Sequence, residues 1–287
     1  MTLSIDRREF LRASGSTLAA TALGVSAMSR SAQAGENTGR IKKAVKYQMI
    51  QSKLSVTDKF KMLKELGYDG VEIPTRDKTD RKLFAKARDI SGLPIHGVIN
   101  SSNPDITSAV ELSKYFGGSS VLVVAGRVNK QNSYDKVYRE TQAIIRKAIP
   151  VVEKHEIKIL IENVWNNFLL SPLEMARYID EFETPWVGAY FDVGNVVRFG
   201  WPDQWIRILG KRIGKLDIKE YSRKKQLDEG LWKGFQVKIG EGDCDWPAVR
   251  KALAEIDFQG WGTAEVRGGD RDRLKEIALR MDKVLDL

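Results

Sequence analysis

Four acidic residues in the second half of the chain are placed where they could act together. Each ends a short apolar run, in ILIENVWN, AYFDVGN, GKLDIKEY and GTAEVRGGD; the residues are Glu162, Asp192, Asp217 and Glu265. If these runs are neighbouring buried strands, the carboxylates share one confined space and repel one another unless a counter-charge is present. A hard divalent cation is the simplest counter-charge, because it binds carboxylate oxygens. The alternative is an acidic rim neutralised by Lys219, Arg223 and Arg267.

The apolar runs belong to a regular alternation that begins at residue 41. Eight short runs alternate with longer segments of helical periodicity; they cover residues 45–50, 70–73, 95–99, 121–124, 157–162, 187–192, 213–218 and 262–266. This pattern predicts an α/β fold, a (β/α)8 TIM barrel forming one domain over residues 41–287. No glycine-rich phosphate-binding motif follows the first run, which disfavours an open nucleotide-binding sheet. In such a barrel the four acidic residues lie at the carboxyl-terminal mouth, where TIM barrels place their active sites.

Other side chains near the predicted mouth are candidates for substrate contact. His96 ends the third run and could bond a substrate hydroxyl, although a structural histidine is an equally good interpretation. Trp165, Trp201 and Trp232 could form an apolar wall for a sugar ring, or could belong to the core; Trp165 is the strongest candidate. The segment 221–245 between the last two runs is unusually long, which is typical of functional or mobile loops.

The composition is that of a globular protein, with 42% hydrophobic and 30% charged residues. The net charge is +9, but the basic residues are interleaved with acids after residue 40. That interleaving indicates solvated helix faces and disfavours a nucleic-acid partner. The single cysteine, Cys244, excludes an intrachain disulfide and has no partners at metal-ligand spacing, so we expect a packing thiol.

The first 34 residues have the pattern of an export signal. Arg7 and Arg8 are followed by Phe10 and Leu11, a mostly apolar stretch over 13–28, and an A-x-A cleavage pattern at 32–34. The arginine pair resembles a twin-arginine signal, which implies the twin-arginine translocase as a partner and a periplasmic protein, soluble after cleavage. The apolar stretch is too short for stable membrane insertion. An amphipathic helix is the alternative; residues 35–40 are expected to be a linker.

Residues 41–285 resemble the xylose isomerase-like TIM barrel superfamily of sugar isomerases and sugar-phosphate epimerases, chiefly through the motifs of the last four runs. The resemblance implies that Glu162 and Glu265 form an acid/base pair and ligate a metal with Asp192. Asp217 and Asn195 occupy positions where the family has histidines. Arg223 lies where the family has a substrate-binding arginine. The candidate substrate-binding residues are therefore His96, Trp165, Asn195, Lys219 and Arg223.

The departure at Asp217 makes the expected metal site all-oxygen, which favours Mn²⁺ or Mg²⁺ over Zn²⁺. A metal that polarises a substrate carbonyl, together with two glutamates that move a proton, performs isomerisation or epimerisation through an enediolate. Export points to a sugar or keto-sugar without phosphate. A lyase or dehydratase acting on an oxidised glycoside is the alternative, as is a non-catalytic exported sugar-binding barrel. The sequence leaves a homo-oligomer open.

Overall fold

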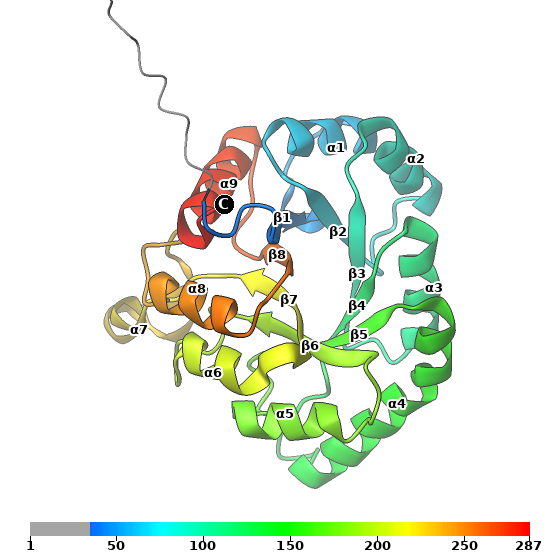
Figure 1. Ribbon diagram of the computed structural model, residues 1–287, viewed down its shortest axis with the longest axis vertical. Helices are drawn as coiled ribbons and strands as arrows, with labels where there is room; N and C mark the ends of the chain where they lie inside the picture. Colours follow the sequence, from blue (N-terminus) through cyan, green and yellow to red (C-terminus); the bar gives the residue numbers. More distant parts are fainter. Residues whose placement is uncertain (1–34) are drawn as a thin grey trace, which may run out of the picture. The chain divides into compact units, whose positions relative to one another are not determined.

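The computed structural model describes residues 35–287, so the predicted export signal lies outside the described residues. Eight parallel strands close into a barrel in chain order, with the last strand paired to the first (Figure 1). The strands are β1 (Ile41–Lys46), β2 (Gly70–Pro74), β3 (Ile95–Ser101), β4 (Ser120–Val123), β5 (Lys158–Glu162), β6 (Val187–Asp192), β7 (Ile213–Ile218) and β8 (Gly260–Ala264). The predicted (β/α)8 barrel is confirmed.

Helices surround the barrel and follow its strands (Figure 1). They are α1 (Val56–Glu65), α2 (Arg81–Ser91), α3 (Ile106–Phe116), α4 (Tyr134–His155), α5 (Pro172–Asp180), α6 (Pro202–Leu209), α7 (Arg223–Glu229), α8 (Trp246–Glu255) and α9 (Arg271–Leu285). Local sequence sets many of the starts: Ser55, Ser133 and Asp245 each accept a backbone hydrogen bond from the first turn of their helix. Among residues 35–287, no helix combines the length and apolarity needed to cross a bilayer.

Apolar side chains fill two regions of the barrel. The larger cluster lies between the strands and the surrounding helices, and a smaller one is formed by Ile99, Leu122, Leu160 and Tyr190. The strands are rich in apolar residues because most of their positions are buried on both faces, as in β4, where all four residues are buried.

The boundaries of the first and last strands differ from prediction. The first strand was predicted at residues 45–50, but β1 is Ile41–Lys46 and a 3-10 helix, η1 (Tyr47–Met49), follows it. Lysines 42, 43 and 46 interrupt the apolar pattern of this strand, yet Lys43 and Lys46 are buried because each pairs with an acid. Because β1 ends at Lys46, this residue lies at the mouth of the barrel. Strand β8 ends at Ala264, so Glu265 directly follows it.

The long segment between β7 and α8 is ordered. It contains α7 and a 3-10 helix, η3 (Leu231–Phe235). The carboxylate of Glu220 anchors its far end, accepting hydrogen bonds from Gly240 N (2.7 Å), Cys244 N (3.0 Å) and Trp246 Nε1 (2.8 Å). Cys244 is a buried free thiol packed in this region, as its sequence context predicts.

Residues 35–40, expected as a linker, form turns that are tied to the end of α9. Asn37 Nδ2 donates to Leu285 O (2.8 Å), and Asn37 N donates to Asp286 O (3.0 Å). This segment is therefore hydrogen-bonded to the barrel domain that it precedes.

Candidate active site

Four carboxylates meet at the carboxyl-terminal mouth of the barrel. Each contributes an oxygen that lies within 4.8 Å of the others; the residues are Glu162, Asp192, Asp217 and Glu265, referred to below as the carboxylate cluster. Asp192 and Asp217 are fully buried, whereas the Glu265 side chain is 31% exposed. The strands position them by alternation, because Asp192 lies two residues after the inward-facing Tyr190 and shares its face. The structure thus brings together all four acidic residues singled out in the sequence.

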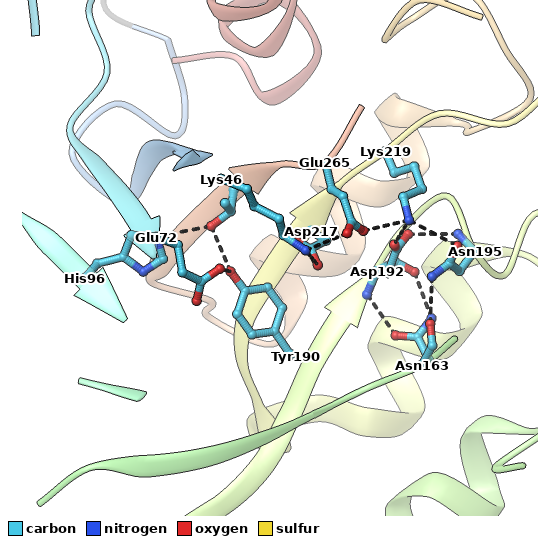
Figure 2. Close-up of polar contacts among 11 residues, drawn as sticks. Lys46, Glu72, His96, Asn163, Tyr190, Asp192, Asn195, Asp217, Lys219 and Glu265 are labelled. Atoms are coloured by element: carbon cyan, nitrogen blue, oxygen red, sulfur yellow. Dashed lines mark hydrogen bonds and ion pairs between the residues drawn. The ribbon is translucent and has the colours of Figure 1, made fainter. Parts of the chain in front are cut away.

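Two lysine ammonium groups lie among these carboxylates (Figure 2). Lys46 Nζ is 2.7 Å from Asp217 Oδ2 and 2.8 Å from Glu265 Oε1. Lys219 Nζ is 2.8 Å from Asp192 Oδ2 and 2.6 Å from Glu265 Oε2. Four formal negative charges therefore face two positive ones. Lys219 was one of the counter-charges considered from sequence, whereas Lys46 was not a candidate.

The lysines separate the protonation behaviour of the two glutamates. Burial, reinforced by the charge of Glu265, raises the pKa of Glu162 to about 8. Burial would also raise the pKa of Glu265, but Lys219 and Lys46 outweigh it and hold that pKa below its ordinary value. The site therefore holds one carboxyl group that favours its proton beside one that favours the ionised form, an arrangement suited to acid/base chemistry.

Two asparagines, Asn163 and Asn195, hold Asp192 in place by hydrogen bonds. Its N–H donates to Asn163 Oδ1 (2.8 Å), and its Oδ1 accepts from Asn195 N (2.8 Å). Asn195 Nδ2 in turn donates to Asn163 O (2.9 Å), which ties the ends of β5 and β6 together (Figure 2). Asn163 was not among the site residues predicted from sequence. Its position directly after Glu162 was the signal that could have indicated it. Asn195 also lines the cavity described below.

A buried polar layer lies within the barrel beside the cluster. It consists of Glu72, His96, Tyr190, Lys215 and Thr263. Tyr190 OH bonds Glu72 Oε2 (3.1 Å) and Thr263 Oγ1 (2.8 Å), while Lys215 Nζ donates to His96 O (2.7 Å) and lies 2.9 Å from His96 Nδ1. Most polar groups of the layer bond one another, but Glu72 Oε1 is buried and finds no hydrogen-bond partner among the described residues.

His96, one of the candidate substrate contacts, lies in this buried layer. Its ring is buried, stacks on Trp261 with centroids 4.5 Å apart, and does not line the cavity. Burial, together with the charge of Lys215, lowers its pKa, so the ring is neutral.

A cavity of about 680 Å³ opens above the carboxylate cluster. Its lining consists of Arg127, Glu162, Val164, Trp165, Asn195, Lys219, Trp232, Phe235, Gln236, Glu265, Val266 and Arg267. The long segment between β7 and α8 contributes Trp232 and Phe235, which lie with ring centroids 5.1 and 4.8 Å from that of Trp165. These three rings form an aromatic wall beside the acidic groups. Another hollow, of about 470 Å³, lies at the amino-terminal ends of β5 and β6 and contains none of the cluster.

Two further candidates lie away from this cavity. The guanidinium of Arg223 donates to Val197 O and Gly200 O, both at 2.7 Å, and stacks over Trp201 at 5.1 Å. Neither Arg223 nor Trp201 lines the cavity. Arg223 therefore joins the start of α7 to the segment after β6.

The cluster fits a divalent cation by donor type and by spacing. All four donors are carboxylates, the ligands that hard divalent cations prefer. Among residues 35–287, Asp217 Oδ1 is buried and finds no hydrogen-bond partner, which leaves one oxygen free for a cation. With all four carboxyl groups ionised, the two lysines leave two negative charges uncompensated. The chain therefore has a buried acidic cluster that could bind a metal.

The sequence of this chain matches a known family model. The model is described as "Xylose isomerase-like TIM barrel", and the match covers residues 60–283. Among curated proteins, no match was found by the sequence comparison.

Solved structures of similar fold include several sugar epimerases. The 3-keto-D-glucoside 4-epimerase YcjR from E. coli superposes with a TM-score of 0.71 at 17% identity, covering 85% of this chain and 98% of that one. D-allulose 3-epimerase from Methylomonas sp. gives 0.68 at 18% identity, covering 85% and 96%. The IolI protein, described with a bound zinc atom, gives 0.70 at 16% identity, covering 85% and 98%. At these identities the likeness establishes the fold.

Proposed function

The chain belongs to the xylose isomerase-like TIM barrel family, and on that premise we propose that it is a sugar isomerase or epimerase that works by proton transfer at the carboxylate cluster. One observation carries the proposal: Glu162 and Glu265 face the same cavity with their pKa values displaced in opposite directions. The sugar epimerases among the similar structures support the substrate class.

The chemistry follows from the positions of the side chains. Glu265, held ionised by two ammonium groups, is the base that takes a proton from carbon beside a carbonyl. Glu162 returns a proton to the opposite face, which gives an epimer, or to the adjacent carbon, which gives an isomer. Lys219 lies at the cavity and orients Glu265.

A metal completes this proposal. A divalent cation held by Glu162, Asp192, Asp217 and Glu265 would stabilise the negative charge that develops on the substrate oxygens. Because every one of these donors is an oxygen, we expect Mn²⁺ or Mg²⁺ in preference to Zn²⁺.

A lyase that acts on an oxidised glycoside is the second candidate. The cavity of about 680 Å³ has room beyond a single sugar ring, and one similar structure is an enzyme of keto-glucosides. The same proton abstraction would begin an elimination. A metal analysis of the purified protein, combined with a screen of keto-sugars and keto-glycosides for deuterium uptake from D₂O, tests both. Deuterium in recovered sugar supports the isomerase, release of an aglycone supports the lyase, and neither result with any compound would reject proton-transfer chemistry.

The aromatic wall should govern substrate binding. We expect Trp165→Ala to raise KM about tenfold with a smaller change in kcat, because the ring contacts the sugar and takes no part in proton transfer. Trp201→Ala is the matched control, since Trp201 is 55% exposed and does not line the cavity. Equal KM values in the two variants would remove Trp165 from the binding site. Steady-state kinetics on the identified substrate decide between these results.

We also propose that the protein is exported by the twin-arginine route into the periplasm, on the strength of Arg7 and Arg8 in the amino-terminal sequence. The double variant Arg7→Lys, Arg8→Lys should leave most of the protein inside the cell as precursor, because that signal is defined by its arginine pair. Fractionation followed by immunoblotting measures this. Replacing Arg30, outside the pair, is the control, and unimpaired export of the double variant would point to the general secretory route.

A further inference from the structure

Besides helping to hold Glu265 ionised, Lys46 reaches the centre of the carboxylate cluster. Its side chain is 2% exposed and extends from the end of β1 toward β7 and β8 (Figure 2). A buried ammonium group is costly unless it is paired, and Lys46 has two partners, Asp217 and Glu265. Its position is therefore determined by the cluster and in turn helps to determine the cluster's geometry.

The two partners of Lys46 are also expected metal ligands. Lys46 Nζ is 2.7 Å from Asp217 Oδ2 and donates a hydrogen bond to it, so that oxygen is already engaged; Asp217 Oδ1 is not. Glu265 is shared, with Oε1 at 2.8 Å from Lys46 and Oε2 at 2.6 Å from Lys219. A cation bound to these two carboxylates would therefore lie beside an ammonium group.

The charges lead to the same conclusion. With all four carboxyl groups ionised the cluster carries four negative charges, and Lys46 and Lys219 supply two positive ones, which leaves a deficit of two. One divalent cation would close that deficit with both lysines in place. Without the cation, the lysines are the counter-charges that keep Asp192, Asp217 and Glu265 from repelling one another.

We propose that Lys46 is an internal cation of this site: it holds Asp217 and Glu265 together when no metal is bound, and it weakens the binding of a divalent cation by occupying oxygens of both carboxylates. Lys46 is thus a positioning residue that makes folding independent of metal. The inference rests on the proposed function only in assuming that the cluster binds a divalent cation, and its test measures binding and stability without turnover.

The test compares Lys46→Met with the wild-type protein in a titration calorimeter, using Mn²⁺ alone as the probe. We expect Kd to fall at least about tenfold in Lys46→Met, because a positive charge beside the ligands has been removed while every ligand remains. Lys43→Met is the matched control. It lies on the same strand and is also buried, but it pairs with Asp282 outside the cluster, so its Kd should equal that of the wild-type protein.

Thermal unfolding in EDTA and in Mn²⁺ provides the second measurement. The wild-type Tm should rise only modestly from EDTA to Mn²⁺, whereas Lys46→Met should unfold at a lower temperature than the wild-type protein in EDTA and gain more in Mn²⁺. A Kd for Mn²⁺ that is unchanged or higher in Lys46→Met would overturn the proposal, as would an absence of Mn²⁺ binding in both proteins.

Two further variants keep the proposal testable if Lys46→Met does not fold. Lys46→Arg keeps the charge and should bind Mn²⁺ as the wild-type protein does, while Lys46→Met combined with Asp217→Asn removes both members of the buried pair and should fold in EDTA. Failure of the double variant to fold in EDTA would also contradict the proposal. Turnover by metal-free wild-type protein would reject metal dependence of the proposed reaction and leave these binding and stability results standing.

Discussion

Replacing either Glu162 or Glu265 by glutamine should reduce kcat by about 10²- to 10⁴-fold, the contribution typical of a positioned general acid or base. Glutamine keeps the size of the side chain but neither accepts nor releases a proton at neutral pH. The two variants should differ in their effects on the site. Glu265→Gln leaves Lys46 and Lys219 with one carboxylate partner each, whereas Glu162→Gln removes a carboxyl group whose pKa is already raised. Glu265→Gln should therefore cost more stability.

Solvent deuterium exchange separates the two roles. With a substrate that epimerises, Glu265→Gln should abolish both exchange and product, while Glu162→Gln should retain some exchange without product if Glu265 still removes the proton. Glu220→Gln is the control, because that carboxylate is also buried at the end of β7 but binds the loop before α8. It should lower Tm and leave kcat of the folded protein unchanged. Near-normal kcat in either Glu162→Gln or Glu265→Gln would end the acid/base assignment.

The barrel could be predicted from sequence because its signals are local and repeated. Strands buried on both faces appear as apolar runs, and an acid at the end of such a run stands out, as Asp192 does after VGAYF. The boundaries of β6 and β7 were predicted correctly: β6 has no charged residue before Asp192, and in β7 only Lys215 interrupts the run before Asp217.

The part of the site that was not predicted from sequence depends on side-chain pairings across the barrel. Lys46 lies 171 residues from Asp217 in sequence, and no local pattern indicates that a lysine in a basic segment is buried against that acid. The first strand was predicted four residues too late, at 45–50. That prediction put Lys46 near the start of the strand, away from the mouth of the barrel. Pairing of side chains on β1, β7 and β8 is a property of the closed barrel, so only the three-dimensional structure shows it.

The same reason explains why the sequence did not indicate that Arg223 and His96 lie outside the lining of the cavity. Each lies at a sequence position suited to substrate contact, but each has protein partners that satisfy its polar groups. Arg223 has two backbone carbonyl acceptors after β6, and His96 has Lys215 and Thr263 inside the barrel. Whether a polar side chain is free to bind substrate depends on such partners, which spacing along the chain does not reveal.

Asp217→His should shift the metal preference of the site from Mn²⁺ toward Zn²⁺ by about a hundredfold in the ratio of dissociation constants, because one oxygen ligand becomes a borderline-soft nitrogen. Asp217 lies in the cluster, where its ion-pair partner is Lys46. The substitution also removes that partner from Lys46, which then has Glu265 alone.

Two further variants separate ligand chemistry from charge. Asp217→Asn removes the same charge without adding a nitrogen ligand, so it should weaken both metals and leave their ratio nearly unchanged. Asp217→His combined with Lys46→Met removes the orphaned ammonium and should bind Zn²⁺ more tightly than Asp217→His alone. Competition titrations with Mn²⁺ and Zn²⁺ across the four proteins measure the ratio. If Asp217→His and the wild-type protein show the same ratio, Asp217 does not ligate the metal, and its buried carboxylate serves only as the partner of Lys46.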